Sequence, residues 1–254
     1  MVSIIIPTYN SQEFLDDCLN SVISQTFAEY EVIIVDDCSN DGTINIIEKF
    51  KKRDQRIKSI YLGVNSGAGV ARNIGLQNSN QRFVTFLDSD DMWFPEKLKT
   101  QVQFMLHNDC AFSYTDYYLL NKNGIPNKRV YCPKIIKRNK LLLNNYIKTL
   151  TVMYDSTKFD KVQMPELRKR QDWGFWFELI KSCKAAHGIS TPLAYYRTSN
   201  KSLSSNKLKL LKENFAFYNK HLNFSKIDSF YRMLIFLKHY FLFRTLKIKK
   251  IRND

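Results

Sequence analysis

Short runs of apolar residues alternate with amphipathic stretches along the first hundred residues of the chain. The segments that resemble buried strands are Val2–Ile6, Glu31–Val35, Ile57–Leu62 and Phe83–Leu87. Stretches with helical spacing of apolar positions follow them, over Ser11–Gln25, Thr43–Lys52, Ala68–Gln77 and Leu98–His107. Parallel strands are buried on both faces and therefore appear as continuous hydrophobic runs. The alternation predicts a doubly wound α/β sheet with parallel strands.

The pattern changes after residue 107. Short strands are predicted at Ala111–Thr115 and Tyr117–Leu120, with a turn at Asn121–Gly124 before a further strand at Val130–Tyr131. The remaining predicted elements are a helix over 172–183, a strand over His187–Tyr196, and helices over 207–221 and 226–247. We therefore expect a mixed sheet in the middle of the chain and helices at its C-terminal end.

Polar residues follow three of the predicted strands directly. They are Thr8-Tyr9-Asn10, Asp36-Asp37 and Asp88-Ser89-Asp90-Asp91. Open α/β sheets bind their ligands beyond the carboxyl ends of the strands, so these residues are expected to meet at one edge. Carboxylates at such an edge suit Mg²⁺, which binds through one or two carboxylates and substrate phosphates. The alternative for the acidic triplet is a solvated loop, because short motifs also arise by chance.

The positive charge of the protein is confined to its second part. The formal net charge is +15, yet residues 1–100 carry 10 Lys and Arg against 14 Asp and Glu, whereas residues 101–254 carry 29 against 10. This asymmetry indicates an anionic partner for the second part, either a nucleic acid or an acidic membrane surface. No recognisable nucleic-acid-binding motif accompanies the charge, so we expect no nucleic-acid partner.

The cysteines and the N-terminus indicate a protein of a reducing compartment. The five cysteines are scattered and include no C-x-x-C pair, so neither a zinc site nor a disulfide framework is predicted. The apolar start, Val2–Ile6, is too short for a signal peptide, and no window reaches the roughly 18 apolar residues of a membrane span. We expect a cytoplasmic protein that does not cross a bilayer.

Six segments of the chain, taken together and in order, form a recognisable pattern. They are Ile4–Asn10, Ser21–Phe27, Val35–Thr43, Gly69–Gly75, Leu87–Asp91 and Arg170–Trp173. With these segments the chain resembles family 2 glycosyltransferases, the inverting enzymes that use nucleotide sugars and have a GT-A fold. The resemblance implies an α/β nucleotide-diphospho-sugar transferase (GT-A) fold, with a Rossmann-like central mixed sheet and C-terminal helices. It implies a glycosyltransferase domain over residues 1–205, with a nucleotide-sugar-binding half (1–100) and an acceptor-binding half (101–205). Residues 206–254 are expected to form a basic amphipathic helical tail.

The resemblance implies a nucleotide pocket built from the first two strand ends. The residues expected to line it are Pro7, Thr8, Tyr9 and Asn10. Asp37 is expected to accept a hydrogen bond from the uracil imide N–H, which suits an ionised carboxylate because that group only accepts. The alternative for Asp37 is a structural role in the turn that leads to the helix at residue 43.

The same family pattern assigns roles to Arg72 and to the acidic triplet. Arg72 is expected to approach the nucleotide, while the neighbouring glycines equally suit a plain helix cap. Asp90 is expected to contact a Mn²⁺ or Mg²⁺ ion, and Asp88 to face the ribose or sugar and share in metal binding. Ser89 is placed with the donor-binding residues, whereas Asp91 is expected to cap the following turn.

Asp172 matches the catalytic base of the family, which takes the proton from the acceptor hydroxyl. Its alternative role is the N-cap of the helix that follows. The aromatic residues Trp173 and Trp176 are more typical of a helix face packed in the core than of a sugar platform. Arg197 and Lys201 lie in a segment that resembles the loop closing over the diphosphate, although a basic surface loop is an equal alternative.

The tail and the resemblance together predict where the protein acts. Residues Tyr231–Arg252 mix large apolar residues with regularly spaced cations, which suits either a helix in an anionic membrane interface or a helix docked on its own domain. We expect a metal-dependent hexosyltransferase at the inner face of the cytoplasmic membrane. It would use a UDP-sugar to extend a saccharide on a polyprenyl diphosphate lipid in O-antigen or capsule synthesis. The rival functions are a nucleotidyltransferase and a basic nucleic-acid-binding protein.

Overall fold

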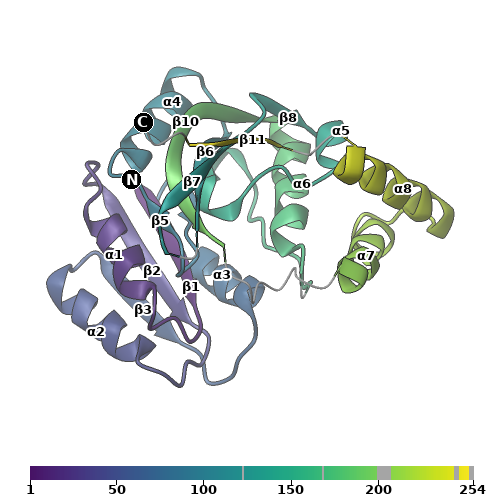
Figure 1. The fold of residues 1–254 in the computed structure, drawn as a ribbon. Coiled ribbons are helices and arrows are strands. Elements are labelled where there is room, and N and C mark those ends of the chain that lie inside the picture. The colour runs from purple at the N-terminus through teal and green to yellow at the C-terminus, as the bar shows by residue number, and fades with distance from the viewer. Residues whose placement is uncertain (122, 168, 199–206, 243–245, 252–254) are drawn as a thin grey trace.

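The computed structural model describes residues 1–121, 123–167, 169–198, 207–242 and 246–251. Figure 1 shows a central sheet with helices on both faces and two C-terminal helices set to one side. Lys201 and the rest of the predicted closing loop after residue 198 lie outside the described residues. The predicted α/β architecture with a mixed sheet and C-terminal helices is confirmed.

The first half is the predicted alternation of parallel strands and helices. Its elements are β1 (Val2–Thr8), α1 (Leu15–Ile23), β2 (Tyr30–Asp36), α2 (Thr43–Arg53), β3 (Ile57–Tyr61), α3 (Ala68–Gln77) and β4 (Phe83–Phe86). The pairs β1 with β2, β1 with β4 and β2 with β3 are all parallel. The strand order is therefore β3-β2-β1-β4, and the carboxyl ends of these strands share one edge.

Alternate residues of the strands pack against different helix layers. Ile4 belongs to one hydrophobic cluster with Leu15 of α1 and Ile47 of α2. Its neighbour Ile5 belongs to a second cluster with Trp176, and α3 lies on this side, because Gly75 of α3 directly contacts Ile5. Since both faces of β1 are covered, every position in that strand is buried.

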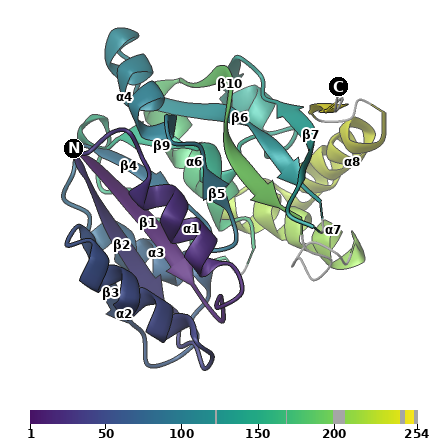
Figure 2. The ribbon, with the colours of Figure 1, turned by 60° about the vertical axis from the view of Figure 1, so that its left-hand side comes forward.

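The second half completes the sheet with mixed strand directions. Its elements are β5 (Met92–Trp93), α4 (Lys97–His107), β6 (Phe112–Leu120), β7 (Pro126–Tyr131), β8 (Ile135–Lys137), α5 (Arg138–Leu141), a 3₁₀ turn at Thr149–Thr151, β9 (Met153–Asp155), a 3₁₀ turn at Ser156–Lys158, α6 (Gln171–Cys183) and β10 (Ala185–Arg197). The long strand β10 runs parallel to β6 and antiparallel to β5 (Figure 2). This pairing carries the end of β10 back to the segment that follows β4.

A single strand, β6, replaces the two strands predicted between residues 111 and 120. The prediction placed a break at Asp116, yet this residue lies inside β6 and is 1 % exposed. The guanidinium of Arg129, on the neighbouring strand β7, donates to Asp116 Oδ2 at 2.9 Å, and the Cys132 N–H donates to Oδ1 at 2.8 Å. Because the buried carboxylate is paired and hydrogen-bonded, the strand continues through it.

The C-terminal segment is helical but ends in a strand. It comprises α7 (Lys207–Ala216), a π-helical turn (Phe217–His221), α8 (Lys226–Leu242) and β11 (Lys247–Lys250). The prediction of a helix through residue 247 is wrong at its end, because β11 pairs antiparallel with β7. Within the described parts of the chain, none of the helices combines the length and apolar character needed to cross a membrane.

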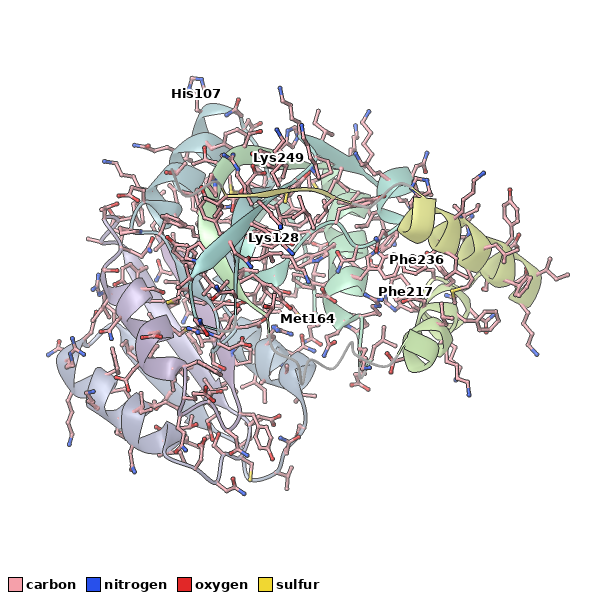
Figure 3. The ribbon with its side chains drawn as sticks, in the orientation of Figure 1. His107, Lys128, Met164, Phe217, Phe236 and Lys249 are labelled. Atoms are coloured by element: carbon pink, nitrogen blue, oxygen red, sulfur yellow. The ribbon has the colours of Figure 1, made fainter. Side chains whose placement is uncertain are left out.

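The C-terminal helices pack against α6 through aromatic side chains. Trp173 stacks on Phe217, with ring centroids 4.4 Å apart and ring planes 12° apart. Met233 and Phe236 of α8 belong to the same core cluster as Trp173, and Figure 3 shows Phe217 and Phe236 on the side of α6 where α7 and α8 lie. One face of α8 is therefore docked on the domain.

Candidate active site

Hydrogen bonds join the ends of β1 and β2 at the predicted nucleotide pocket. Thr8 Oγ1 donates to Asp36 Oδ1 at 3.1 Å. Asn10 has a positive φ of 47°, and its side-chain oxygen accepts the Asn40 N–H at 2.9 Å. Pro7 is buried within β1, whereas the side chain of Tyr9 is 49 % exposed at the edge. The four predicted residues thus form a connected strand end with one aromatic ring open to solvent.

Asp37 binds the loop that precedes α3. Its Oδ1 accepts the Ser66 N–H and its Oδ2 accepts the Gly67 N–H, both at 2.7 Å, and the residue is 3 % exposed. The structural role that the sequence left open is therefore real, although Asp37 holds the loop before α3 and not the turn before α2. Each carboxylate oxygen keeps a second lone pair that can accept from a ligand.

The acidic loop after β4 is tied to the end of β1. The hydroxyl groups of Ser11 and Ser89 lie 2.7 Å apart. The side chain of Asp88 forms an ion pair with Arg72, which lies in the first half of α3 and is 7 % exposed. The loop therefore brings Arg72, Asp88 and Ser89 together with the β1 edge, as the predicted donor site requires.

Burial makes two carboxylates of this loop difficult to ionise. Burial, and after it the neighbouring Asp88 carboxylate, raise the pKa of Asp90 to about 6, against the lowering effect of a backbone hydrogen bond, Arg197 and Arg72. Burial, followed by Asp90 and Asp88, also raises the pKa of Asp91 well above its ordinary value. A divalent cation would offset the mutual repulsion of these carboxylates, and hard oxygen ligands of this kind are those that Mn²⁺ and Mg²⁺ take.

These carboxylates therefore fit the cation that the resemblance implies, although they do not form a complete set of metal ligands by themselves. Among the described residues, no three His, Cys, Asp or Glu side chains form a ready-made cluster of ligands. Asp88 is engaged with Arg72, so a cation at Asp90 would share this carboxylate with the guanidinium. Substrate phosphates commonly supply remaining ligands to Mg²⁺.

Arg197 reaches the acidic loop from the end of β10. Its N–H donates to Asp91 Oδ1 at 2.9 Å, and its Nε donates to the Asp90 carbonyl oxygen at 3.1 Å. The prediction that Asp91 caps the following turn is wrong, because its carboxylate binds the β10 end instead. The Asp91 side chain is 1 % exposed, so this bond fixes the point where the chain leaves the sheet.

Asp172 lies in the first turn of α6, beside the donor edge. The N-cap position of α6 is Arg170, so the N-cap role considered for Asp172 does not apply. Gln171 touches α3, because a Cβ added to Gly69 would lie 2.9 Å from Gln171 Nε2. A side chain at Gly69 would therefore require the Gln171 side chain to move.

Tyr196 links the two groups of carboxylates. Burial raises the pKa of its hydroxyl, and Asp91, Asp88, Asp90 and Asp172 raise it further. One side chain therefore lies in the electrostatic field of both the acidic loop and Asp172. Trp173 and Trp176 are fully buried, which confirms that they belong to the core.

Two residues of the site escaped the sequence reasoning. Asn145 Nδ2 donates to Asp172 Oδ2 at 2.7 Å, from an irregular segment after α5. Tyr196 was predicted as the last residue of a strand and the first of the segment that resembles the closing loop, without a role of its own. Neither carries a local signal, because each acts through residues that are distant in the sequence: Asn145 donates to Asp172, 27 positions away, and Tyr196 lies in the field of Asp88, Asp90 and Asp91. Ser11, in contrast, adjoins the polar strand end and was detectable there.

Comparisons with known proteins all identify glycosyltransferases. The model of the family described as Glycosyl transferase family 2 matches residues 3–161. Over 229 residues the chain is 43 % identical to TuaG of Bacillus subtilis, which is named as a glycosyltransferase of teichuronic acid biosynthesis. This match covers 89 % of the chain and 91 % of TuaG. It is 38 % identical over 213 residues to WfgD of Escherichia coli, with 84 % of this chain and 83 % of WfgD covered. The name of WfgD describes a β-1,3-glucosyltransferase that uses UDP-glucose and α-D-GlcNAc-diphosphoundecaprenol.

A solved structure shows the same architecture. The crystal structure of residues 1–349 of Staphylococcus aureus TarS in complex with UDP-GlcNAc superposes with a TM-score of 0.71 at 25 % identity. The superposition covers 94 % of this chain and 73 % of the TarS fragment. The chain spans 44 % of a longer TarS structure.

Proposed function

This chain belongs to glycosyltransferase family 2 and has the predicted GT-A fold, and from that premise we propose that it transfers a hexose or N-acetylhexosamine from a UDP-sugar, with inversion, to a saccharide acceptor. The observation that carries the proposal is that the half-buried Tyr196 lies in the electrostatic field of both the acidic loop after β4 and Asp172, in the first turn of α6. Family membership also decides for glycosyl transfer over the rival nucleotidyltransferase and nucleic-acid-binding functions.

The donor half of the site would be residues 1–100, together with Arg197 from the end of β10. Residues Pro7, Thr8, Tyr9 and Asn10 would line the uridine. Asp37 would accept the imide N–H of the base while it holds the Ser66–Gly67 backbone. Arg72 and Arg197 lie beside the acidic loop, where their charges would balance the diphosphate. A UDP-sugar bound here would place its sugar toward Asp88 and Ser89.

Asp90, with Asp88, would hold a Mn²⁺ or Mg²⁺ ion. When bound, this ion would act as a Lewis acid for the β-phosphate, where negative charge grows as the glycosidic bond breaks. The raised pKa of Asp90 supports the assignment, because a bound cation would stabilise the ionised form of a carboxylate that burial and Asp88 disfavour. Both carboxylates lie on the loop whose position is set by the Ser11–Ser89 contact and by Arg197.

Asp172 would be the general base. Its carboxylate takes the proton of the acceptor hydroxyl as the hydroxyl oxygen attacks the anomeric carbon, and the bond to the β-phosphate oxygen breaks on the opposite face. The products are the extended saccharide, with inverted anomeric configuration, and UDP. Asn145 donates to Asp172 Oδ2, which leaves the other oxygen, Oδ1, to accept the proton. Such a base contributes about 10²–10⁴-fold to the rate.

The acceptor is proposed to be a saccharide on a polyprenyl diphosphate lipid in surface polysaccharide synthesis. The printed name of WfgD, with its undecaprenyl diphosphate acceptor, supports this class of acceptor. Residues 101–205, which include Asp172, would bind it. Such an acceptor would place the enzyme at the inner face of the cytoplasmic membrane.

The face of α8 that points away from the domain supports attachment to an anionic membrane surface. Its side chains at helical spacing are exposed: Ile227 (84 %), Phe230 (60 %), Tyr231 (64 %) and Leu234 (49 %). Exposed lysines at 226 and 238 flank this stripe. An apolar helical stripe bordered by cations is typical of interfacial helices. The two roles considered for the tail are thus compatible, because Met233 and Phe236 dock on the core from the other face of α8.

The test is transfer from a panel of UDP-sugars with Mn²⁺ or Mg²⁺, using lipid-linked saccharides as acceptors. We expect one UDP-sugar to be consumed, EDTA to abolish the reaction, and Asp172→Asn to bind UDP normally while losing at least a hundredfold in turnover. Activity in excess chelator would contradict the metal assignment. Turnover that survives in Asp172→Asn would place the base elsewhere, and a panel without any active donor would overturn the proposed function.

A further inference from the structure

The two residues that precede α6 are held by α7. Arg170 Nε donates to Asn214 Oδ1 at 2.8 Å, and Lys169 Nζ lies 3.3 Å from Glu213 Oε2. Asn214 is fully buried, and the side chains of Lys169 and Glu213 are 13 % and 23 % exposed. These contacts join residues 44 positions apart in the sequence. The C-terminal helix α7 therefore reaches the segment that leads directly into the first turn of α6, where Asp172 lies.

Arg170 adopts a backbone conformation that needs external support. Its φ is +68°, in the left-handed region that residues with a Cβ atom avoid. Its carbonyl oxygen accepts the Gly174 N–H at 3.0 Å, so this conformation sets the start of α6. Burial lowers the pKa of the Arg170 guanidinium, while Asp172, Glu213 and Tyr218 raise it. The partly buried guanidinium therefore lies among Asp172 and the C-terminal helices.

The residues after Asp172 are held by the same C-terminal segment. Trp173 stacks on Phe217 of the π-helical turn at 4.4 Å. Gly174 leaves no room for a side chain, because a Cβ there would lie 2.7 Å from His221 Nε2. The residues on both sides of Asp172 in the sequence are thus held in place by the segment 213–221. A small shift of this turn would move the carboxylate relative to the donor edge, and displacements of about 1 Å can cost a hundredfold in rate.

We propose that Asn214 and Glu213 are positioning residues for the base, so that α7 belongs to the catalytic apparatus and is not a separate tail. This inference rests on the proposed function, in which Asp172 takes the proton of the acceptor. Asn214 accepts from Arg170, Arg170 keeps its left-handed conformation, and the first turn of α6 then presents Asp172 to the acceptor hydroxyl. We call the contacts of Asn214 with Arg170 and of Glu213 with Lys169 the α7 clamp. The donor-binding residues Pro7–Asn10 and Asp37 lie on other elements and take no part in it.

The test compares three variants of α7 in the full chain. Asn214→Leu removes the acceptor of Arg170 with little change in volume, and we expect kcat for transfer to fall at least tenfold, with the Kd for UDP unchanged. Asn214→Asp keeps an acceptor oxygen and should restore kcat to within about threefold of the wild type. Lys212→Ala changes an exposed residue of the same helix and serves as the matched control.

A double-mutant cycle separates positioning from general damage. If Asn214 acts through the base, Asn214→Leu should lower kcat much less in the Asp172→Asn background than in the wild type, since groups that act as a unit are not additive. Thermal unfolding of each variant monitors folding. Wild-type kcat in Asn214→Leu, an equal loss in Asn214→Asp, or losses that add fully in the double variant would overturn the proposal. A wild type that binds UDP but transfers no sugar would overturn the proposed function and this inference with it.

Discussion

Replacing Asp90 by asparagine should stabilise the cation-free protein at neutral pH while it abolishes transfer. Burial is the largest cause, with Asp88 second, of the rise in the pKa of Asp90 from 3.8 to about 6. A carboxyl group whose pKa is higher in the folded state binds its proton more tightly there. The stability of the folded state therefore falls as the pH rises from about 4 to about 6, and the full penalty remains above that range.

The size of the effect follows from the shift. A rise of about two pKa units corresponds to about 3 kcal/mol at 1.36 kcal/mol per unit. Because Asp90 keeps part of its surface in solvent, we expect Asp90→Asn to gain about 1–3 kcal/mol at pH 7.5 and almost nothing at pH 4. The asparagine has nearly the same shape, so packing contributes little to the difference.

The assay is urea denaturation in EDTA at pH 4 and pH 7.5, with Asp160→Asn as a control at an exposed carboxylate. Added Mn²⁺ should then stabilise the wild type, since a ligand of the folded state adds RT ln(1 + [L]/Kd). It should stabilise Asp90→Asn far less. The reasoning is refuted if Asp90→Asn is less stable than the wild type at pH 7.5, or if the difference between them is the same at both pH values.

Three further predictions concern other parts of the molecule. Asp37→Asn should weaken UDP binding at least tenfold by calorimetry, at roughly 1.5–3 kcal/mol for a charged hydrogen bond; unchanged affinity would remove Asp37 from the pocket. Burial lowers the pKa of Lys97 well below its ordinary value, so Lys97→Met should be more stable than the wild type at pH 7, by a margin that shrinks toward pH 10. A Met variant that denatures earlier at both pH values would contradict this. Phe230→Ser combined with Leu234→Ser should release the protein from anionic vesicles in flotation assays, and undiminished flotation would argue against the α8 stripe as the contact.

The strands and helices of the first half were predictable because their signal is local. The strands β1, β2 and β4 are mostly apolar runs that are buried along their whole length, and polar residues such as Thr8 and Asp88 mark where two of them end. The position of a strand end along the chain, combined with parallel pairing, is sufficient to place these residues on a common edge. The predicted donor side chains therefore gather at that edge in the structure.

The second half was less predictable because its pairing partners are distant in sequence. Asp116 appeared to break a strand until Arg129 was placed beside it. Residues 247–250 appeared helical because their spacing suits both a helix and an edge strand, and the free edge of β7 decides between them. In each case a long-range partner outweighs the local pattern.

The sequence by itself determined the fold class, the edge of the sheet at which we propose the donor site and the carboxylates that lie there, since hydrophobic period and strand-end chemistry are properties of neighbouring residues. Only the tertiary structure decided how Asp172 is held. Asn145 and the α7 clamp on Arg170 come from segments with no motif, and their effect exists only because folding brings them to the first turn of α6. Orientation of a side chain depends on contacts across the chain, and such contacts leave no periodic trace in the sequence.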